Sequence, residues 1–223
     1  MAIQVEFLRA IPYFSGLNTA ELDSINRVIF EKTAERGEMI LVEDEPAEIL
    51  YFVASGVVKV FKTSSEGKEQ ILTIVRPGDS FGDIPIFDGG PNPASAQAMG
   101  PVVLYGIRRS DLEAILQNYP QVALNVTKVL AGQARHLGSL VEDLSFRHVI
   151  GRVARILLEY AGNGTAPRPR LTQQEMAAMA GTVREVVGRS LKALEEEGSI
   201  RLERQRIVVI NREALRDIVD AYS

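Results

Sequence analysis

The spacing of apolar residues changes along the chain and divides it into segments of different structure. From residue 33 to 107 the apolar residues form short runs rich in β-branched and aromatic side chains, separated by turns that contain glycine. This texture is typical of a compact antiparallel sandwich or barrel. We predict strands at Met39–Val42, Ile49–Ala54, Gly56–Lys62, Gln70–Arg76 and Val102–Arg108.

Helical spacing dominates the rest of the chain. Asn18 and Glu21 predict the start of a short helix that places Leu22, Ile25 and Ile29 on one side. Proline is favoured in the first turn of a helix, and a long helix is therefore expected to begin at Pro120. Further predictions are helices from Ser110 to Tyr119, Pro120 to Ser145, Phe146 to Ala161 and Arg212 to Tyr222, with a loop from Gly162 to Pro169.

The helix predicted from Pro120 to Ser145 carries a seam of residues at alternating spacings of four and three. Such a seam suits a two-stranded coiled coil, in which a single polar residue can set the register. We therefore predict this seam as the dimer interface, with packing of the same face on the β domain of its own chain as the alternative. The seam consists of Val126, Leu130, Gln133, Leu137, Leu140 and Leu144.

Residues 171–198 predict two helices joined by a tight turn. Thr172 followed by Glu175 is a capping box, and Thr182 followed by Glu185 predicts a second one. Between the two lies Gly181, which can adopt the left-handed backbone that ends a helix. This arrangement is the pattern of a helix-turn-helix.

The second helix of this pair has one apolar and one charged face. Val187, Leu191 and Leu194 recur at spacings of four and three, so they are expected to face inward. An arginine on the opposite face could bond a guanine edge in the DNA major groove, and a glutamate could accept from cytosine. The alternative is an ordinary helical hairpin with a charged solvent face. The outward residues are Arg184, Glu185, Arg189 and Lys192.

A β-hairpin is predicted immediately after this helix. Ile200 and Leu202 on one side, and residues 207–210 on the other, flank the polar stretch 203–206. A hairpin in this position makes the motif a winged helix-turn-helix. Arg201, Arg204 and Arg206 could reach the DNA backbone from it.

The charges of this 223-residue chain are distributed unevenly. Residues 1–145 carry 12 Lys+Arg and 19 Asp+Glu, a net charge of 12 − 19 = −7, whereas residues 146–223 carry 13 and 10, a net charge of 13 − 10 = +3. The positive charge therefore accompanies the helix-turn-helix. An acidic remainder is compatible with a localised basic contact to nucleic acid and opposes indiscriminate adhesion.

The composition excludes several kinds of site. The chain has no cysteine, which excludes disulfides, thiol nucleophiles, cysteine-ligated zinc and iron–sulfur clusters held by cysteine. The first residues lack the pattern of a signal peptide, and no uninterrupted apolar stretch approaches about 18 residues. We expect a cytoplasmic protein without membrane contact.

Two motifs carry a resemblance to a known family. The segment Arg184–Arg189, REVVGR, is similar to the R-E-T-V-G-R motif of the cyclic-AMP receptor protein branch, and Pro77–Asp83, PGDSFGD, resembles that family's P-G-D-x-x-G-E motif. With the order of the predicted elements, the chain resembles the cyclic-AMP receptor protein and fumarate–nitrate regulator family along nearly its whole length.

The resemblance implies an α+β fold in three parts: a β-roll effector domain at residues 1–118, a dimerisation helix at 119–145 and a winged helix-turn-helix at 146–223. It also implies an interface with double-stranded DNA in which a trio of base-contacting residues falls on Arg184, Glu185 and Arg189. The expected DNA-binding set is Arg184, Glu185, Arg189, Thr182, Val183, Lys192, Gln173 and Arg204.

The implied effector site departs from the cyclic-AMP pattern. Where that branch has an Arg-Ser pair that binds the cyclic phosphate, this chain has Pro93-Ala94, and Leu137-Gly138 replace hydroxyl residues that touch the purine. A buried anion without a cation or donors carries a large desolvation cost, so cyclic AMP is disfavoured. The expected pocket is Gly82, Asp83, Ile84, Pro93, Ala94, Ser95 and Leu137. Asp83 could accept from a sugar hydroxyl or serve only as a turn residue.

Haem is the other sensor to consider in such a family. Only His136 and His148 could be conventional nitrogen ligands, and each lies beside an arginine, Arg135 or Arg147. This setting favours histidines that face solvent, although haem stays open as a cofactor.

The leading hypothesis is a homodimeric, sequence-specific transcriptional regulator on a two-fold symmetric operator, with RNA polymerase as an expected partner. A small effector bound in the β-roll could gate it. It could also act without an effector, respond to haem or a gas, respond to a cyclic nucleotide, or use its helix-turn-helix on a protein partner. Catalysis is disfavoured because the chain has no Ser-His-Asp signature and no phosphate-binding loop.

Overall fold

The computed structural model describes residues 5–160, 171–203 and 206–221. The loop predicted from Gly162 to Pro169 and the predicted DNA contact Arg204 lie outside these described residues. Among the described helices, none is long and apolar enough to cross a membrane.

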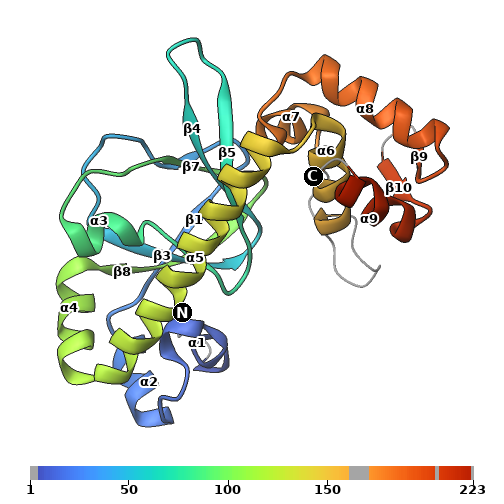
Figure 1. The fold of residues 1–223 in the computed structure, drawn as a ribbon. Helices are drawn as coiled ribbons and strands as arrows, with labels where there is room; N and C mark the ends of the chain where they lie inside the picture. The colour runs from blue at the N-terminus through green and yellow to red at the C-terminus, as the bar shows by residue number, and fades with distance from the viewer. Residues whose placement is uncertain (1–4, 161–170, 204–205, 222–223) are drawn as a thin grey trace. The chain divides into compact units, whose positions relative to one another are not determined.

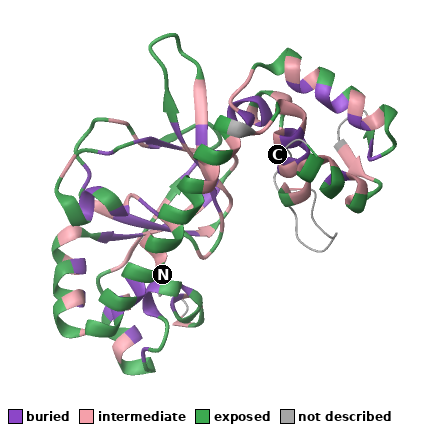
Figure 2. Cartoon of the chain, in the orientation of Figure 1, coloured by how far each residue is buried: buried purple, intermediate pink, exposed green. Residues whose placement is uncertain are grey.

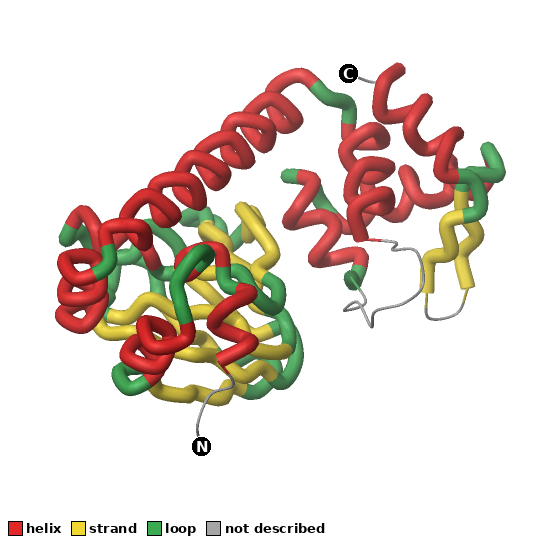
Figure 3. The backbone as a smooth tube through the Cα atoms, turned by 90° about the horizontal axis from the view of Figure 1, so that it is seen from below, coloured by secondary structure: helices red, strands yellow, loops and turns green. Residues whose placement is uncertain are grey.

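The chain divides into two compact units (Figure 1). One comprises Met1–Lys62 and Thr73–His136, and the other comprises Thr63–Leu72 and Leu137–Ser223. Helix α5, Pro120–Phe146, is a single uninterrupted helix that contributes residues to both units (Figure 3).

Two four-stranded sheets form the β domain. Its strands are β1 (Phe30–Ala34), β2 (Met39–Leu41), β3 (Ile49–Ser55), β4 (Val58–Thr63), β5 (Glu69–Val75), β6 (Ser80–Phe81), β7 (Ser95–Ala98) and β8 (Val102–Arg108). One sheet has the order β1-β8-β3-β6 and the other the order β2-β7-β4-β5. The described pairings are antiparallel, so the predicted antiparallel β domain is confirmed.

Three strands of these sheets were not predicted: β1, β6 and β7. Strand β6 has only two residues, and β7 falls between the predicted strands at Gln70–Arg76 and Val102–Arg108. Strand β7 contains no β-branched or aromatic residue, which is the usual sequence signal of a strand. It is nevertheless buried, since Ala96 is 1% and Ala98 2% exposed. Its small side chains allow the strand to pack closely, but they give no sequence pattern from which a strand could be predicted.

Strand β3 is buried on both faces. Its successive side chains alternate, as the pleat of a strand requires. Leu50 and Phe52 belong to a core cluster shared with the helices, whereas Tyr51 and Val53 belong to the cluster between the two sheets. This explains why β3 reads as a continuous apolar run.

Helices cover the outer face of the β3 sheet. They are α1 (Val5–Ala10), the 3₁₀ helix η1 (Pro12–Phe14), α2 (Thr19–Asn26), α4 (Arg109–Asn118) and the first half of α5. Helix α2 begins with a complete capping box between Asn18 and Glu21, as that pair of residues suggested. A further short helix, α3 (Asp83–Asp88), follows β6.

Helix α5 differs between its two halves. Val126 is 5% exposed and packs in its own chain's core, and Leu130 packs partly against the same core. The expectation that Val126 faces a second chain is therefore wrong, because the heptad spacing in this half serves the β domain. In the second half Leu137 is 42% and Leu144 36% exposed. Figure 2 shows exposed residues along much of this helix.

Helices and one hairpin form the second unit around a separate core. Its elements are α6 (Val149–Tyr160), α7 (Gln173–Ala180), α8 (Arg184–Glu196), β9 (Ile200–Glu203), β10 (Arg206–Val209) and α9 (Arg212–Ala221). Val153, Met176 and Leu215, each 1% exposed or less, anchor this core from three helices. Strands β9 and β10 pair antiparallel, with Arg206 opposite Glu203, so the predicted wing is confirmed.

Candidate nucleic-acid interface

Helix α8 presents a charged face to solvent and buries an apolar one. Val187, Leu191 and Leu194 are fully buried, as their spacing predicted. They pack in the same cluster as Met176 and Ala180 of α7. Figure 2 shows exposed and buried segments alternating along this helix. The residues predicted to face outward are all exposed: Arg184, Glu185, Arg189 and Lys192.

A tight turn joins α7 to α8. Helix α7 begins with the predicted capping box, in which Thr172 Oγ1 accepts from the Glu175 amide at 3.1 Å and Glu175 accepts from the Thr172 amide at 2.6 Å. It ends at Gly181, whose φ of 62° is the left-handed conformation that glycine adopts readily. The predicted helix-turn-helix is confirmed.

The second predicted capping box, Thr182 with Glu185, is wrong. Helix α8 begins one residue later than expected, so its N-cap is Val183, which has no side-chain hydrogen bond to the helix. The reason lies in α7, because the Thr182 amide donates to the Ala177 carbonyl at 3.0 Å and completes the C-terminal cap of that helix.

The charged face of α8 is largely uncommitted. Arg184, Glu185 and Arg189 form no ion pair with any residue that the structure describes. Lys192 lies 3.9 Å from Glu196 in an exposed pair, which contributes little to stability. Gln173, at the start of α7, approaches α8 near Gly188, since its Oε1 lies 3.9 Å from where a Cβ of Gly188 would stand. Arg184, Glu185 and Arg189 therefore lie exposed with no ionic partner among the described residues.

A carboxylate of α8 attaches the wing to the helix. Glu195 Oε1 accepts from the Leu202 amide of β9 at 2.6 Å. On the same strand Arg201 is exposed and lies 3.4 Å from Glu203. The wing is thereby held in a defined position beside the recognition helix.

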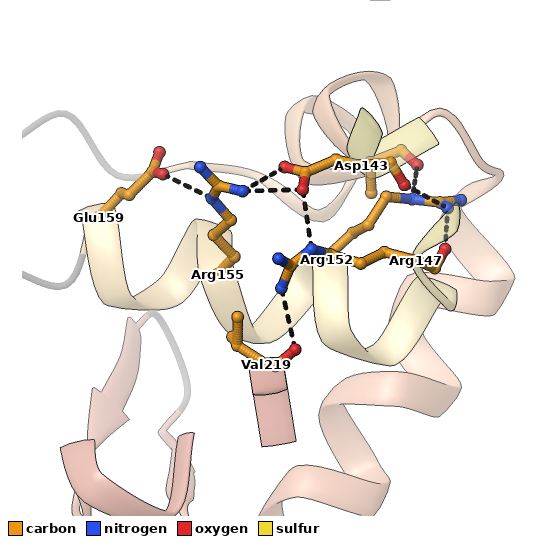
Figure 4. A network of polar contacts seen from close by, with 7 residues as sticks. Asp143, Arg147, Arg152, Arg155, Glu159 and Val219 are labelled. Atoms are coloured by element: carbon orange, nitrogen blue, oxygen red, sulfur yellow. Dashed lines mark hydrogen bonds and ion pairs between the residues drawn. The ribbon is translucent and has the colours of Figure 1, made fainter. Parts of the chain in front are cut away.

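A cluster of charged residues joins the end of α5 to α6 (Figure 4). Asp143 accepts from Arg155 Nη1 with both carboxylate oxygens, at 2.7 and 2.8 Å, and lies 2.8 Å from Arg147 Nε. Arg147 also donates to the Val219 carbonyl of α9 at 2.9 Å. Asp143 therefore neutralises two arginines at the junction of three helices.

A third arginine of this cluster bonds backbone carbonyls. Arg152 Nε donates to the Ala180 carbonyl of α7 at 2.7 Å, and its Nη1 donates to the carbonyls of Asp143 and Arg147. Burial lowers the pKa of Arg152, and the nearby Asp143 opposes that shift. The cluster fixes the last turn of α5 against the helices of the second unit.

Asp83, the acidic residue of the expected effector pocket, is hydrogen-bonded inside the first unit. It is 4% exposed and opens α3. Its Oδ2 accepts from the Tyr13 hydroxyl at 3.0 Å and from Gln133 Nε2 at 2.9 Å, while Oδ1 accepts from the Ile84 amide at 3.1 Å. Burial, and then the Asp83 carboxylate, raise the pKa of Tyr13, which keeps the hydroxyl protonated as a donor.

Neither Tyr13 nor the bond from Gln133 was predicted for this pocket. Gln133 was expected on the dimer seam, but its amide is committed to Asp83 within the chain. Spacing along a helix could not reveal this contact, because the two residues are 50 positions apart in the sequence. Tyr13 lies 70 positions from Asp83, so its role also needs the three-dimensional structure.

The segment that replaces the Arg-Ser pair offers no free cation. Pro93 is exposed and Ala94 buried, and the Ser95 hydroxyl accepts from the Glu43 amide at 3.0 Å. Lys62 donates to the Pro93 carbonyl at 3.0 Å, but it also pairs with Glu43 at 2.6 Å. Of the remaining expected pocket residues, Gly82 has a left-handed φ of 79°, Ile84 is 41% exposed, and Leu137 belongs to the second unit.

The two histidines are both exposed, as expected. No group of three or more histidine, cysteine, aspartate or glutamate residues that could hold a metal ion occurs in the described part of the chain.

Comparison with known families identifies both parts of the chain. Residues 31–119 match the cyclic nucleotide-binding domain, and residues 151–218 match the Crp-like helix-turn-helix domain. The first match covers the β domain and α4, and the second covers the helix-turn-helix and its wing.

Whole-length similarities agree with these matches. The chain is 35% identical over 195 residues to the cyclic AMP receptor protein of Thermus thermophilus, covering 87% of this chain and 90% of that protein. It is 31% identical over 217 residues to the CRP-like cAMP-activated global transcriptional regulator of Mycobacterium tuberculosis, covering 94% and 97%. The structure of FixK2 from Bradyrhizobium japonicum superposes with a TM-score of 0.77 at 31% identity, covering 86% and 97%.

The Tyr13 hydroxyl is expected to stabilise the first unit through Asp83. Tyr13→Phe removes one donor from a buried carboxylate, which should lower the free energy of unfolding by about 1.5–3 kcal/mol in a urea titration. Tyr119→Phe is the matched control, since the Tyr119 hydroxyl has no hydrogen bond to a described residue, and should change stability by less than about 0.5 kcal/mol. Equal effects of the two variants would contradict the assigned role.

Asp143 is expected to stabilise the second unit. Asp143→Asn keeps the shape but leaves Arg147 and Arg155 without their carboxylate, and should lower the free energy of unfolding by about 1–3 kcal/mol. The control is Glu196→Gln, because the Glu196 side chain is 69% exposed at 3.9 Å from Lys192 in the same unit. Loss of that exposed pair should cost only about 0.2–1 kcal/mol. Thermal or urea unfolding of both variants would show whether Asp143 is the stronger contributor.

Proposed function

The chain belongs to the cyclic-AMP receptor protein and fumarate–nitrate regulator family of DNA-binding transcriptional regulators, and we propose that it acts as a homodimer on a two-fold symmetric operator without requiring cyclic AMP. The observation that carries the DNA-binding part is helix α8. Its apolar face is buried, and three residues of its exposed face, Arg184, Glu185 and Arg189, have no ionic partner among the described residues.

The exposed side chains suit direct contact with base edges. An arginine can donate two hydrogen bonds to guanine O6 and N7, and a glutamate can accept from the cytosine amino group. We assign these contacts to Arg184 or Arg189 and to Glu185, so each half-site contains at least one G·C pair. Lys192, Gln173, Thr182 and Arg201 are placed on elements that could contact phosphates and fix the orientation of the helix.

The second half of α5 supports the proposed dimer. Leu137, Val141 and Leu144 follow the spacings of four and three, and their exposures are 42%, 63% and 36%. Val141 was absent from the predicted seam. Leu140 is half-buried beside them. Pairing of these residues between two chains would set two recognition helices about 34 Å apart, in successive major grooves.

Independence from cyclic AMP is supported by the polar contacts of the β domain. The relatives in Thermus and Mycobacterium carry cyclic AMP in their names. In this chain Asp83 already accepts three hydrogen bonds, and Pro93-Ala94 offers a cyclic phosphate neither a charge nor a hydroxyl. Burying a phosphate there would leave its charge uncompensated.

We further propose RNA polymerase as a partner of the DNA-bound dimer, and no catalytic activity for the chain. Activation or repression would follow from the position of the operator relative to a promoter, which the chain does not encode.

Arg184→Ala is expected to weaken operator binding and to relax one base position. The operator would first be selected by the wild-type protein from a pool of random duplexes. The variant should lose about 1–3 kcal/mol of binding free energy, because a bidentate contact to guanine disappears. Lys192→Ala should instead weaken binding uniformly across sequences. Selection of the same consensus by Arg184→Ala, with unchanged affinity, would show that Arg184 does not contact a base.

Cyclic AMP is expected to leave operator affinity unchanged. Fluorescence anisotropy with the selected operator, with and without saturating cyclic AMP, measures this directly. A tenfold gain in affinity, which corresponds to about 1.4 kcal/mol of coupling, would contradict the proposal. As a control, titration calorimetry of the protein with cyclic AMP detects any binding of the nucleotide that does not change the affinity for DNA.

A further inference from the structure

Val183 occupies an unusual position for an apolar side chain. It is the N-cap of the recognition helix α8, with an extended backbone at φ −110° and ψ 155°. Its side chain makes no capping hydrogen bond and is 51% exposed. It is also absent from the buried cluster that holds the inner face of this helix.

Helix N-caps favour serine, threonine, aspartate and asparagine, whose oxygens accept from the first amides of the helix. The chain uses such caps elsewhere, since Asn18 caps α2 and Thr172 caps α7, both with complete capping boxes. Valine is among the least favourable residues at this position. Ile11 of η1 and Arg108 of α4 are also N-caps without a side-chain hydrogen bond, but Ile11 is buried and Arg108 is charged. Val183 differs from both because it is apolar and exposed on the proposed binding surface. A local rule broken at such a position indicates a function for the residue that breaks it.

The position of Val183 defines which ligand group it can meet. The N-terminal residues of a recognition helix reach the base edges of the major groove. Arg184, the next residue, is exposed and is one of the two arginines proposed above to contact a guanine. The apolar group displayed in the major groove is the C5 methyl of thymine, and it is recognised by apolar side chains.

We propose that Val183 is a specificity-determining residue that contacts the methyl group of a thymine next to the base pair recognised by Arg184. This inference rests on the proposed function, because it requires that α8 enter the major groove of an operator. It adds a second kind of recognition to the charged trio, in which an apolar contact selects T·A at one position of each half-site.

Replacement of thymine by uracil tests this contact, because it removes only the C5 methyl and keeps base pairing. In the operator selected by the wild-type protein, each thymine would be replaced in both half-sites together. We expect one symmetric pair of replacements to weaken binding about threefold to fivefold per half-site, as loss of one buried methyl group implies. Val183→Ala should bind the thymine and uracil operators equally at that position, while thymines elsewhere serve as internal controls.

Val183→Ser separates recognition from helix stability. Serine supplies the missing capping oxygen, so the melting temperature of the variant should rise above that of the wild type. Its affinity for the thymine operator should nevertheless fall, and its response to uracil should vanish. If Val183 were only structural, affinity would follow stability and the uracil response would persist.

The outcomes distinguish this inference from the proposed function. Suppose that the wild type selects a symmetric consensus and that Arg184→Ala loses its preference for a guanine in it. If no replacement of thymine by uracil then weakens binding of the wild type more than binding of Val183→Ala, the role of Val183 alone is overturned. Failure to enrich any symmetric sequence would overturn both proposals. A uracil effect that is lost in both Val183 variants would support the contact.

Discussion

The burial of one apolar stripe on helix α8 determines which residues the second unit exposes for binding. Val187, Leu191 and Leu194 are fully buried against α6 and α7, and this packing fixes the rotation of the helix about its axis. Once that rotation is fixed, Arg184, Glu185 and Arg189 must face solvent. The turn at Gly181 and the bond from Glu195 to the wing then set the direction of the helix and the position of the hairpin beside it.

Two carboxylates, the buried Asp83 and the half-buried Asp143, hold the rest of the chain in a comparable way. Asp83 connects η1 and α5 to the β domain through Tyr13 and Gln133, and Asp143 connects the end of α5 to α6 through two arginines. A buried carboxylate without donors would be strongly destabilising. Each of these acids therefore constrains the elements that supply its partners. Asp83 was expected to contact a ligand, but it instead links η1 and α5 to the start of α3 through its hydrogen bonds.

Local patterns predicted the elements better than they predicted the partners of those elements. The capping box at Thr172, the turn at Gly181 and the inward face of α8 each depend on residues whose successive members lie no more than four positions apart, and all three are confirmed. The heptad spacing of α5 also predicted a helix correctly. It could not show what the apolar face meets, so Val126 was assigned to a second chain although it lies in its own core. The capping box expected at Thr182 was wrong because that residue's amide had already been used by α7.

The sequence separation of interacting residues also explains why the family resemblance predicts the DNA-binding helix better than it predicts the effector site. A recognition helix is specified by a short segment, so similarity in that segment transfers the geometry of its exposed residues with few further conditions. The surroundings of Asp83, in contrast, are assembled from residues 50 and 70 positions away, and a change at Tyr13 or Gln133 alters the hydrogen bonds of that carboxylate. In this chain Tyr13 and Gln133 already donate to the Asp83 carboxylate, and the side chains of Pro93 and Ala94 carry no hydrogen-bond donor. The β domain therefore keeps the architecture of a cyclic nucleotide-binding domain, but the carboxylate of Asp83 is already hydrogen-bonded from within the chain.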